Sequence, residues 1–305
     1  MEYPLVTVFG GSGFVGRHAV QALAEAGYRI RVAVRRPKAA NFLQPLGQVG
    51  QIQIVKCDVT DAKTIAASVK NAHAVINLVG IQRQSSRQRF KTLHVEAASR
   101  IAKAAMDANA PVFVHVSALG ASLTSSARFA YTKAMGEALV REAFPAATIL
   151  RPSLIYGPED KFFNRFAWLA RLSPVLPLGG DGENKCQPVF VGDVARAIVK
   201  AVKDPAATRG RSYDLGGPGV YSIKDLVGLV LEQTGRKRAV LGVGLSRNKR
   251  DSVIPRGALS FDDLGITPTT VEAILPTYLW RFRSKEKLRG RAKAVAAHNR
   301  ALAST

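Results

Sequence analysis

The segment from Val6 to Gly16 constrains the fold most, because an apolar strand runs there directly into three glycines spaced three residues apart. Gly10 permits a tight turn, Gly13 lacks the Cβ that would block a phosphate, and Gly16 lets a following helix pack close to the strand. A helix that begins near Phe14 directs its unpaired N–H groups and the positive end of its dipole at a bound anion. The segment therefore predicts a pyrophosphate-binding loop. Its expected contacts are Gly10, Ser12, Gly13, Phe14, Val15 and Gly16.

Apolar strands alternate with amphipathic helices up to about Arg151, which is the pattern of a doubly wound parallel sheet. After Pro152 the Gly and Pro residues are spaced as in loops and short elements. We expect an α/β, Rossmann-type sheet and a smaller, discontinuous C-terminal lobe, because a later helix and strand return to the sheet. The expected strands are 5–9, 29–34, 52–55, 74–78, 112–116, 148–150 and 212–215, with a helix at 190–202. The expected boundaries are 1–153 plus about 189–220 for the sheet domain, about 154–188 and 221–275 for the smaller lobe, and 276–305 for a basic tail.

Charge is the second strong feature of the chain. Its 44 Lys and Arg residues outnumber its 22 Asp and Glu residues, which gives a net charge of +22. Such an excess indicates an acidic neighbour, for which nucleic acid, anionic lipid headgroups and an acidic protein are the alternatives. No recognised nucleic-acid motif accompanies the charge, so we expect no nucleic-acid partner. The two cysteines and five histidines follow no metal-ligand spacing, and we expect no metal site.

Part of the positive charge is concentrated at the C-terminal end, where aromatic residues precede a run of Lys and Arg. Aromatic side chains flanked by such cations bind at interfaces with anionic headgroups. The segment from Trp280 to Lys293 is therefore expected to contact anionic lipid or an acidic groove of another protein.

The end of the second strand indicates which nucleotide the loop prefers. A fold of this type that selects NAD places an Asp or Glu there on the ribose 2′-hydroxyl. This chain has Arg35 and Arg36 instead, whose guanidinium groups match a 2′-phosphate in charge and geometry. We therefore expect NADP(H), and NADPH in particular. Asp58 and Val59, after the third strand, are expected near the adenine, and Leu78, Val79 and Gly80, after the fourth strand, beside the cofactor.

Several short motifs together resemble the extended short-chain dehydrogenase/reductase superfamily. They are Gly10 to Gly16, Cys57-Asp58-Val59, Asn77 to Gly80, and Arg151 to Pro158.

Three further segments give a narrower resemblance, to the nucleotide-binding accessory subunits of respiratory complex I, the NADH:ubiquinone oxidoreductase. The segments are Gly157 to Phe166, Gln187 to Val194 and Ala273 to Phe282, and the likeness covers nearly all of the chain through Arg283. The resemblance implies an NADP(H)-holding subunit of the peripheral arm near the membrane, with other complex I subunits as partners. It places the chain on the cytoplasmic face of a bacterial inner membrane, or on the matrix side of a mitochondrial one.

The resemblance also implies a catalytic pair from which this chain departs. Active members of the superfamily carry a Tyr four residues before a Lys on one helix, where i and i+4 share a face. Lys133 is present, but Phe129 stands where the Tyr belongs and has no proton to give. Tyr131 lies about 200° around the helix from Lys133 and is only a fallback.

The site is therefore expected to be degenerate, with no efficient catalysis by this chain. Lys133 still suits ribose hydroxyls, Ser117 matches the position of the superfamily's catalytic hydroxyl, and Pro152 is expected beside the cofactor. Two alternatives stay open. One is a free-standing NADPH-dependent reductase or epimerase, for instance one linked to a quinone pathway. The other is a nucleic-acid-binding regulator with a dinucleotide sensor, which only the net charge supports.

Overall fold

The computed structural model describes residues 4–86, 88–244 and 251–283. The chain divides into two compact units, each of which is discontinuous in sequence. Residues 252–268 group with the first unit, although the sequence pattern put them in the smaller lobe. The first unit is Met1–Leu154, Val191–Gly216 and Ser252–Pro268, and the second is Ile155–Phe190, Gly217–Asp251 and Thr269–Thr305.

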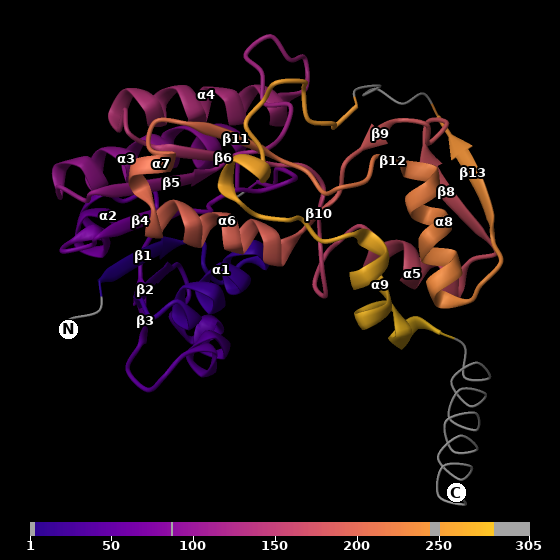
Figure 1. The fold of residues 1–305 in the computed structure, drawn as a ribbon, viewed down its shortest axis with the longest axis horizontal. Helices are drawn as coiled ribbons and strands as arrows, with labels where there is room; N and C mark the ends of the chain where they lie inside the picture. Colours follow the sequence, from indigo (N-terminus) through magenta and orange to yellow (C-terminus); the bar gives the residue numbers. More distant parts are fainter. Residues whose placement is uncertain (1–3, 87, 245–250, 284–305) are drawn as a thin grey trace, which may run out of the picture. The chain divides into compact units, whose positions relative to one another are not determined.

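The described part of the first unit is built on a seven-stranded parallel sheet (Figure 1). The strand order β11-β6-β5-β4-β1-β2-β3 reverses between β1 and β4, and ligands of such sheets bind at this reversal, beyond the carboxyl ends of the strands. The structure confirms the predicted Rossmann-type fold. The strands are β1 (Leu5–Phe9), β2 (Arg29–Val34), β3 (Ile52–Lys56), β4 (Ala74–Asn77), β5 (Val112–Val116), β6 (Thr148–Pro152) and β11 (Ser212–Leu215).

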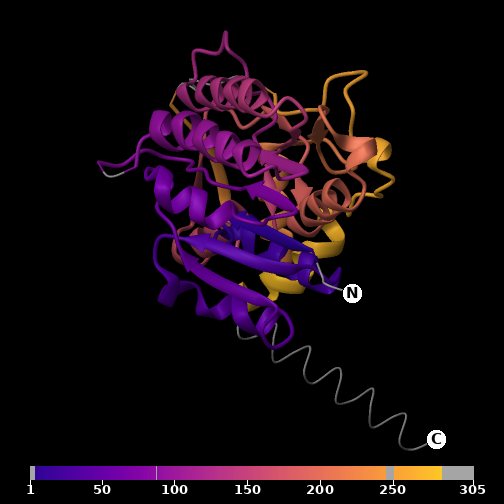
Figure 2. The same cartoon turned by 90° about the vertical axis from the view of Figure 1, so that its left-hand side faces the viewer.

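Helices cover both faces of this sheet (Figure 2). On one face, Ile101, Val140 and Phe144 pack with the sheet residues Val75 and Phe113 in one apolar cluster. On the other face, α1 lies against α6, and α6 also contacts β5 and β6. The first set of helices is α2 (Ala62–Val69), α3 (Ala97–Asp107) and α4 (Arg128–Ala143), and the second is α1 (Phe14–Glu25) and α6 (Val191–Lys203).

The glycines between β1 and α1 allow the backbone at the start of α1 to lie close to the backbone of the preceding turn. Gly10 has a φ of +79°, a conformation that other residues rarely adopt. A Cβ on Gly16 would lie 2.3 Å from the Gly10 carbonyl oxygen and 2.6 Å from the Gly11 backbone. A side chain at position 16 would therefore push α1 away from the turn, so Gly16 fixes the start of the helix beside the end of β1.

The second unit is smaller and has its own apolar core. Ala170 of α5, Val227 of α8 and Leu176 and Leu178 of β8 form this core. Ser222 caps α8 reciprocally with Asp225, in the arrangement called a capping box. The helices are α5 (Phe163–Leu172), α8 (Ile223–Thr234) and α9 (Val271–Leu279), and the paired strands are β8 (Val175–Gly179) with β13 (Ala239–Val243), β7 (Ile155–Tyr156) with β10 (Val189–Phe190), and β9 (Lys185–Cys186) with β12 (Tyr221–Ser222).

One buried carboxylate holds α9 to the start of α5. Asp160 accepts hydrogen bonds from the Phe163 amide (2.6 Å) and from the Tyr278 hydroxyl (2.6 Å). Burial raises the pKa of the Asp160 carboxyl, and the pKa of the Tyr278 hydroxyl is raised by burial and by Asp160. The hydrogen bonds satisfy a charge that would otherwise be costly in this apolar interior.

The remaining elements are short, and no described helix is long and apolar enough to cross a membrane. They are η1 (Pro37–Leu46), η2 (Lys91–Glu96), α7 (Pro205–Thr208), η3 (Asp262–Leu264) and η4 (Trp280–Phe282).

Gly16→Ala tests the close packing of α1 against the turn. Because its Cβ would lie 2.3 Å from the Gly10 carbonyl oxygen, we expect the free energy of unfolding to fall by about 2 to 3 kcal/mol. Gly228→Ala is the matched control, because Gly228 is an exposed position within α8 where a Cβ meets no atom within 4 Å. The control should raise stability by about 0.5 to 1 kcal/mol. Chemical denaturation followed by circular dichroism measures both, and equal losses would contradict the interpretation.

Candidate functional site

The N-terminus of α1 is open toward solvent at the glycine loop. The Gly13 amide donates to the Gly10 carbonyl (3.0 Å), which closes the turn. Gly13 is the N-cap of α1, and neither a side-chain cap nor an acidic residue occupies the first turn. Gly13 is exposed, and a Cβ there would meet only the Gly10 carbonyl oxygen, at 3.2 Å. The loop can thus receive an anion on backbone N–H groups, with the helix dipole favouring negative charge.

The glycine loop lies directly beside the end of β4. A Cβ on Gly10 would be 3.0 Å from the carbonyl carbon and oxygen of Leu78. The Leu78 amide donates to the Phe9 carbonyl (3.0 Å), and the Val79 amide donates to Asn77 Oδ1 (3.0 Å). Two predicted cofactor segments, the loop and residues 78–80, are therefore in contact.

A buried imidazole supports this edge of the site from behind. Asn77 Nδ2 lies 3.2 Å from His115 Nδ1, so the amide that orients Val79 is itself held by a ring on β5. Burial lowers the pKa of His115 well below its ordinary value, so the ring is neutral. We did not predict this pair, because nothing in the sequence spacing links two residues on different strands.

Lys133 lies in the interior and reaches the same place. Its side chain is 6 % exposed, and its ammonium donates to the Val116 carbonyl (3.1 Å). A Cβ on Gly80 would be 3.4 Å from Lys133 Nζ. The ammonium thus lies between the ends of β4 and β5, where Gly80 and Ser117 also lie.

The tyrosine position is filled by a packed apolar ring. Helix α4 begins at Arg128, so Phe129 and Lys133 share a face, whereas Tyr131 is 40 % exposed on another. The Phe129 ring meets the ring of His94 edge-on at 5.5 Å and that of Phe90 at 5.9 Å. Because α4 already includes Phe129, Tyr131 is not on the face of the helix that bears Lys133.

His94 is a functional candidate that the sequence patterns missed. It is stacked on Phe90 at 5.0 Å, and its Nδ1 lies 3.1 Å from Thr132 Oγ1 and its Nε2 3.0 Å from the Ile81 carbonyl oxygen. Burial, together with the charge of Lys133, lowers the pKa of His94 to about 4. A neutral ring that is bonded at both nitrogens is suited to ordering the 81–94 segment rather than to proton transfer.

An ion network runs behind Lys133. Glu137, one turn later on α4, accepts from Arg151 through Nε (3.0 Å) and Nη2 (2.6 Å), and Arg151 Nη1 lies 3.7 Å from Asp214. Burial lowers the pKa of Lys133 to about 8, and the charge of Glu137 acts in the opposite direction. Hydrogen bonds from Arg151 thus hold a carboxylate that favours the charged form of the buried lysine.

Ser117 adds an unsatisfied group at the same edge. Its side chain is 5 % exposed, and its Oγ has no hydrogen-bond partner among the described residues. The Nε2 of His115, two residues earlier, is orphaned in the same way. Buried hydroxyls are ordinarily paired, so an orphan beside an ammonium fits a site that awaits the oxygen atoms of a ligand. Pro152 ends β6 next to this group, and its carbonyl accepts from the Leu119 amide (2.9 Å).

The remaining predicted contacts form a second group at the ends of β2 and β3. Arg35 and Arg36 are exposed, and the Gln88 side-chain amide has one atom 2.6 Å from both terminal nitrogens of Arg35, which accepts from them when that atom is the amide oxygen. Hydrogen bonds from Thr60 and the nearby charge of Arg35 lower the pKa of Asp58. Arg35 therefore lies near enough to Asp58 for their charges to interact.

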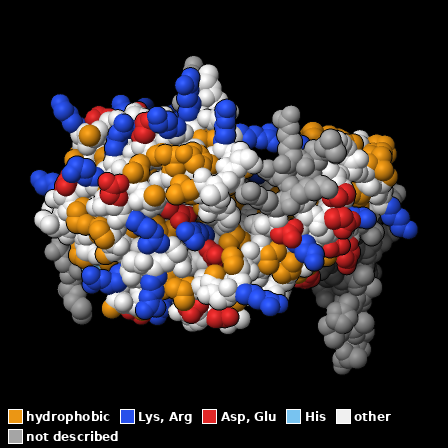
Figure 3. All heavy atoms as spheres, turned by 90° about the horizontal axis from the view of Figure 1, so that it is seen from above, with side chains coloured by type: hydrophobic (Ala, Val, Ile, Leu, Met, Phe, Trp, Pro, Cys, Tyr) orange, Lys and Arg blue, Asp and Glu red, His pale blue; other side chains and the backbone are white. Residues whose placement is uncertain are grey.

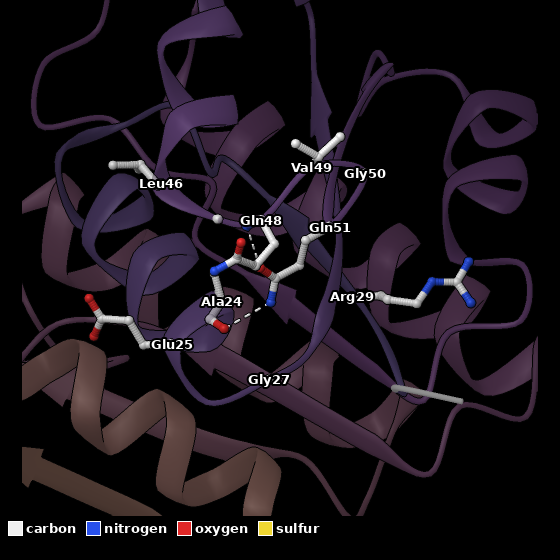
Figure 4. A pocket seen from close by; sticks show the side chains of 10 residues that line it. Ala24, Glu25, Gly27, Arg29, Leu46, Gln48, Val49, Gly50 and Gln51 are labelled. Carbon is white, nitrogen blue, oxygen red and sulfur yellow. Dashed lines mark hydrogen bonds between the residues drawn. The ribbon is translucent and has the colours of Figure 1, made fainter. Parts of the chain in front are cut away.

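A separate hollow of about 470 Å³ lies at the opposite edge of the sheet, where β2 and β3 begin (Figure 4). Gln51 crosses it and donates to the Ala24 carbonyl (2.8 Å). None of the predicted contacts lines this hollow, so it is distinct from the candidate site. Its lining is Ala24, Glu25, Gly27, Arg29, Leu46, Gly47, Gln48, Val49, Gly50 and Gln51.

On the one face of the described residues drawn in Figure 3, Lys and Arg side chains are scattered among polar and apolar groups. A dispersed charge of this kind differs from the continuous basic stripe that tracks a nucleic-acid backbone.

The sequence matches the model of the NAD dependent epimerase/dehydratase family over residues 6–216. The chain is 36% identical over 230 residues to the mitochondrial NADH dehydrogenase (ubiquinone) 1 alpha subcomplex subunit 9 of Arabidopsis thaliana, covering 75% of this chain and 57% of the relative. It is 30% identical to the 40 kDa subunit of NADH-ubiquinone oxidoreductase of Neurospora crassa, covering 91% of this chain and 79% of that subunit. A third relative, the ceramide reductase of Caulobacter vibrioides, is 34% identical, over 66% of this chain and 62% of the enzyme.

The chain spans about three fifths of the length of the first of these relatives. Among solved structures, dTDP-glucose 4,6-dehydratase of Streptomyces venezuelae aligns with a TM-score of 0.76 at 22% identity, covering 91% of this chain and 96% of that one. That likeness concerns the fold, and the dehydratase structure contains bound NAD.

Lys133→Met tests the buried ammonium through the pH dependence of folding. The pKa of Lys133 is about 8 in the folded chain, against an ordinary value of 10.5. Between these pH values the unfolded chain binds more protons, so stability rises with pH across the window. We expect the wild type to gain up to about 3 kcal/mol relative to the methionine variant from pH 8 to 10.5. Urea unfolding at each pH measures this, and parallel curves for the two proteins would contradict it.

Proposed function

Since this chain belongs to the NAD dependent epimerase/dehydratase family, we propose that it is a nucleotide-holding accessory subunit of a respiratory NADH:quinone oxidoreductase. The observation that carries the proposal is that the glycine loop, residues 78–80 and Lys133 lie along one edge of the sheet, while an apolar ring, Phe129, stands four residues before Lys133. The chain is similar to subunits of NADH:ubiquinone oxidoreductases, over 91% of its length in one case, and this similarity is the reason for proposing that assembly.

NADP(H), and NADPH in particular, is the proposed nucleotide. Its pyrophosphate would lie on the N–H groups at the start of α1, from Ser12 to Gly16. Arg35 and Arg36 would take the 2′-phosphate, because guanidinium groups bind phosphate oxygens in pairs. Asp58 and Val59 would border the adenine, and residues 78–80 with Pro152 would border the ribose and nicotinamide.

Lys133 and Ser117 would hold the second ribose. The buried ammonium and the orphaned hydroxyl supply donors where ribose hydroxyls need them. The nucleotide would bring hydride chemistry, but the tyrosine that supplies the matching proton in active members of the superfamily is replaced here by Phe129. Phe129 has no proton to give, and Tyr131 is exposed on another face of α4. We therefore assign the chain a structural role in binding the nucleotide, near the junction of the peripheral arm with the membrane.

The aromatic end of the described chain is proposed as a membrane-side contact. Trp280 is 52% exposed and follows α9 directly. Trp168 on α5 is also 52% exposed, so the second unit has exposed indoles of the kind that bind at lipid headgroups. Residues 284–293 of the predicted contact lie outside the described part of the chain.

A free-standing NADPH-dependent reductase is the second candidate. The specific observation in its favour is the likeness to a ceramide reductase, together with the retained Lys133 and Ser117. This candidate needs a proton donor other than the residue at position 129.

Arg35→Glu tests the choice of nucleotide. The carboxylate removes a partner of the 2′-phosphate and repels it, whereas NADH lacks that group. We expect NADPH to bind at least about tenfold more weakly and NADH to change less than threefold, as measured by nucleotide fluorescence titration. Arg209→Glu is the matched control, since Arg209 is an exposed arginine far along the chain, after α7. Equal losses for the two nucleotides would remove the assignment.

Purification from native membranes tests the proposed function. A tagged full-length chain should co-fractionate with NADH:quinone oxidoreductase subunits, and denaturation should release NADP(H), identified by mass spectrometry. A chain that ends at Arg283 keeps the described contacts of the second unit, so it should retain the nucleotide and lose at least about tenfold in membrane association, because the basic residues that attract anionic headgroups are gone.

Other results would decide against the proposal. A wild-type chain that migrates alone and turns over NADPH with a carbonyl substrate would favour the reductase. A truncated chain that stays bound to membranes would show that the tail is not the anchor.

A further inference from the structure

Within the part of the chain that the structure describes, the pair of strands β8 and β13 in the second unit is covered on one face only. Leu176 and Leu178 of β8 and Val240 of β13 face the apolar core under α5 and α8. The alternate residues face outward, and Leu241 is 52% exposed and Val243 53% exposed. In Figure 3, hydrophobic side chains gather at the right-hand end of the view, the end at which Figure 1 shows these strands.

The outer edge of β13 has backbone groups that pair with no other strand among the described residues. The strands are parallel, with Ala239 beside Val175 and Leu241 beside Pro177. The Ala239 amide donates to the Pro174 carbonyl and the Gly180 amide donates to the Val243 carbonyl, so odd-numbered residues of β13 bond to β8. The alternation of a parallel ladder directs the N–H and C=O of Val240 and Gly242 to the other edge. Among the described residues, only β8 pairs with β13.

The two edges of this small sheet differ in how they are protected. On β8, the residues whose backbone groups point to the free edge of the strand include Pro177. Proline has no N–H, so it blocks the addition of another strand at that edge. On β13, the sequence Ala-Val-Leu-Gly-Val contains neither proline nor a charged residue. In most proteins, such residues on an exposed edge strand prevent it from pairing with a strand of another molecule. The edge of β13 therefore has the properties of a strand that is covered in an assembly.

The charge beside the edge indicates the chemistry of the partner. Arg236, Lys237 and Arg238 precede β13 directly. Arg236 and Arg238 donate to the carbonyls of Phe282 and Ala170, which fixes two positive charges near the start of the strand, and Lys237 is exposed. An approaching segment with acidic residues at this end would gain favourable electrostatic interactions that speed and orient its association.

We propose that the free edge of β13 accepts an extended, acidic segment of a neighbouring subunit as a third strand. Backbone bonds to Val240 and Gly242 would supply affinity. Apolar side chains of the segment would cover Leu241 and Val243, and its acidic residues would lie near Lys237. The inference rests on the proposed function only in naming the oxidoreductase as the assembly that supplies the strand.

Hydrogen exchange of single amides tests the edge in the full chain, free and within the oxidoreductase extracted from native membranes. The amides of Val240 and Gly242 should exchange fast in the free chain and at least about 100-fold more slowly in the assembly, since partner carbonyls would then bond them. The Ala239 amide, which bonds to β8, is the internal control and should be protected in both.

Variants give a second readout. Leu241→Lys with Val243→Lys, and separately Lys237→Glu, should weaken association with the oxidoreductase at least about tenfold. Val220→Lys is the matched control, because Val220 is 49% exposed in the same unit, away from this edge, and it should bind as the wild type does.

Several outcomes would overturn the proposal. Fast exchange of Val240 and Gly242 within the assembly would do so, as would normal association of the edge variants. Protection that appears in the concentrated free chain and disappears on dilution would assign the edge to a second copy of this chain instead. Failure of the wild type to associate at all would count against the proposed function itself, which distinguishes the two results.

Discussion

The close approach of the Gly10 carbonyl oxygen to the backbone of Gly16 is the contact on which the candidate site depends. It allows α1 to begin at Phe14, directly after the turn that ends β1. Gly10 is simultaneously in contact with Leu78, so the first turn of α1 is tied to the end of β4 at the reversal of the strand order. The Lys133 ammonium beside Gly80 extends the same edge to β5. A side chain at position 16 would push α1 away from this turn and so move its N–H groups relative to the end of β4.

The buried ammonium of Lys133 is an electrostatically unfavourable part of this arrangement, and the cost of burying it links the stability of the fold to ligand binding. Burial lowers the pKa of Lys133 to about 8, so the folded chain without a ligand is less stable at neutral pH than it would be with an uncharged group there. Glu137 offsets part of this effect, and Arg151 holds Glu137 in place. A ligand that offers hydroxyl oxygens to the ammonium would recover more of the lost solvation. Binding and folding stability are then coupled, as expected of a nucleotide that serves as a fixed part of a structure.

The sequence predicted those features that depend on neighbouring residues. The strands of the main sheet follow from short apolar runs, and the start of α1 follows from glycines at positions 10, 13 and 16, so the strand bounds and the start of α1 agree with the structure to within a residue or two. The contacts of Asn77 with His115, of Glu137 with Arg151 and of Asp160 with Tyr278 join residues 14 to 118 positions apart. No local pattern encodes such pairs. His94 was missed because a lone histidine without metal spacing has no sequence signal until its aromatic neighbours are known.

Two places in the chain break a local rule, and both point away from chemistry and toward assembly. Phe129 stands on the face of α4 that bears Lys133, and its partly buried ring packs against the rings of His94 and Phe90. The edge of β13 lacks the proline that protects its partner strand at Pro177. Natural sequences break such rules at functional sites and compensate elsewhere. The proposed nucleotide-holding role and the proposed strand addition both treat this chain as a component whose partners complete it.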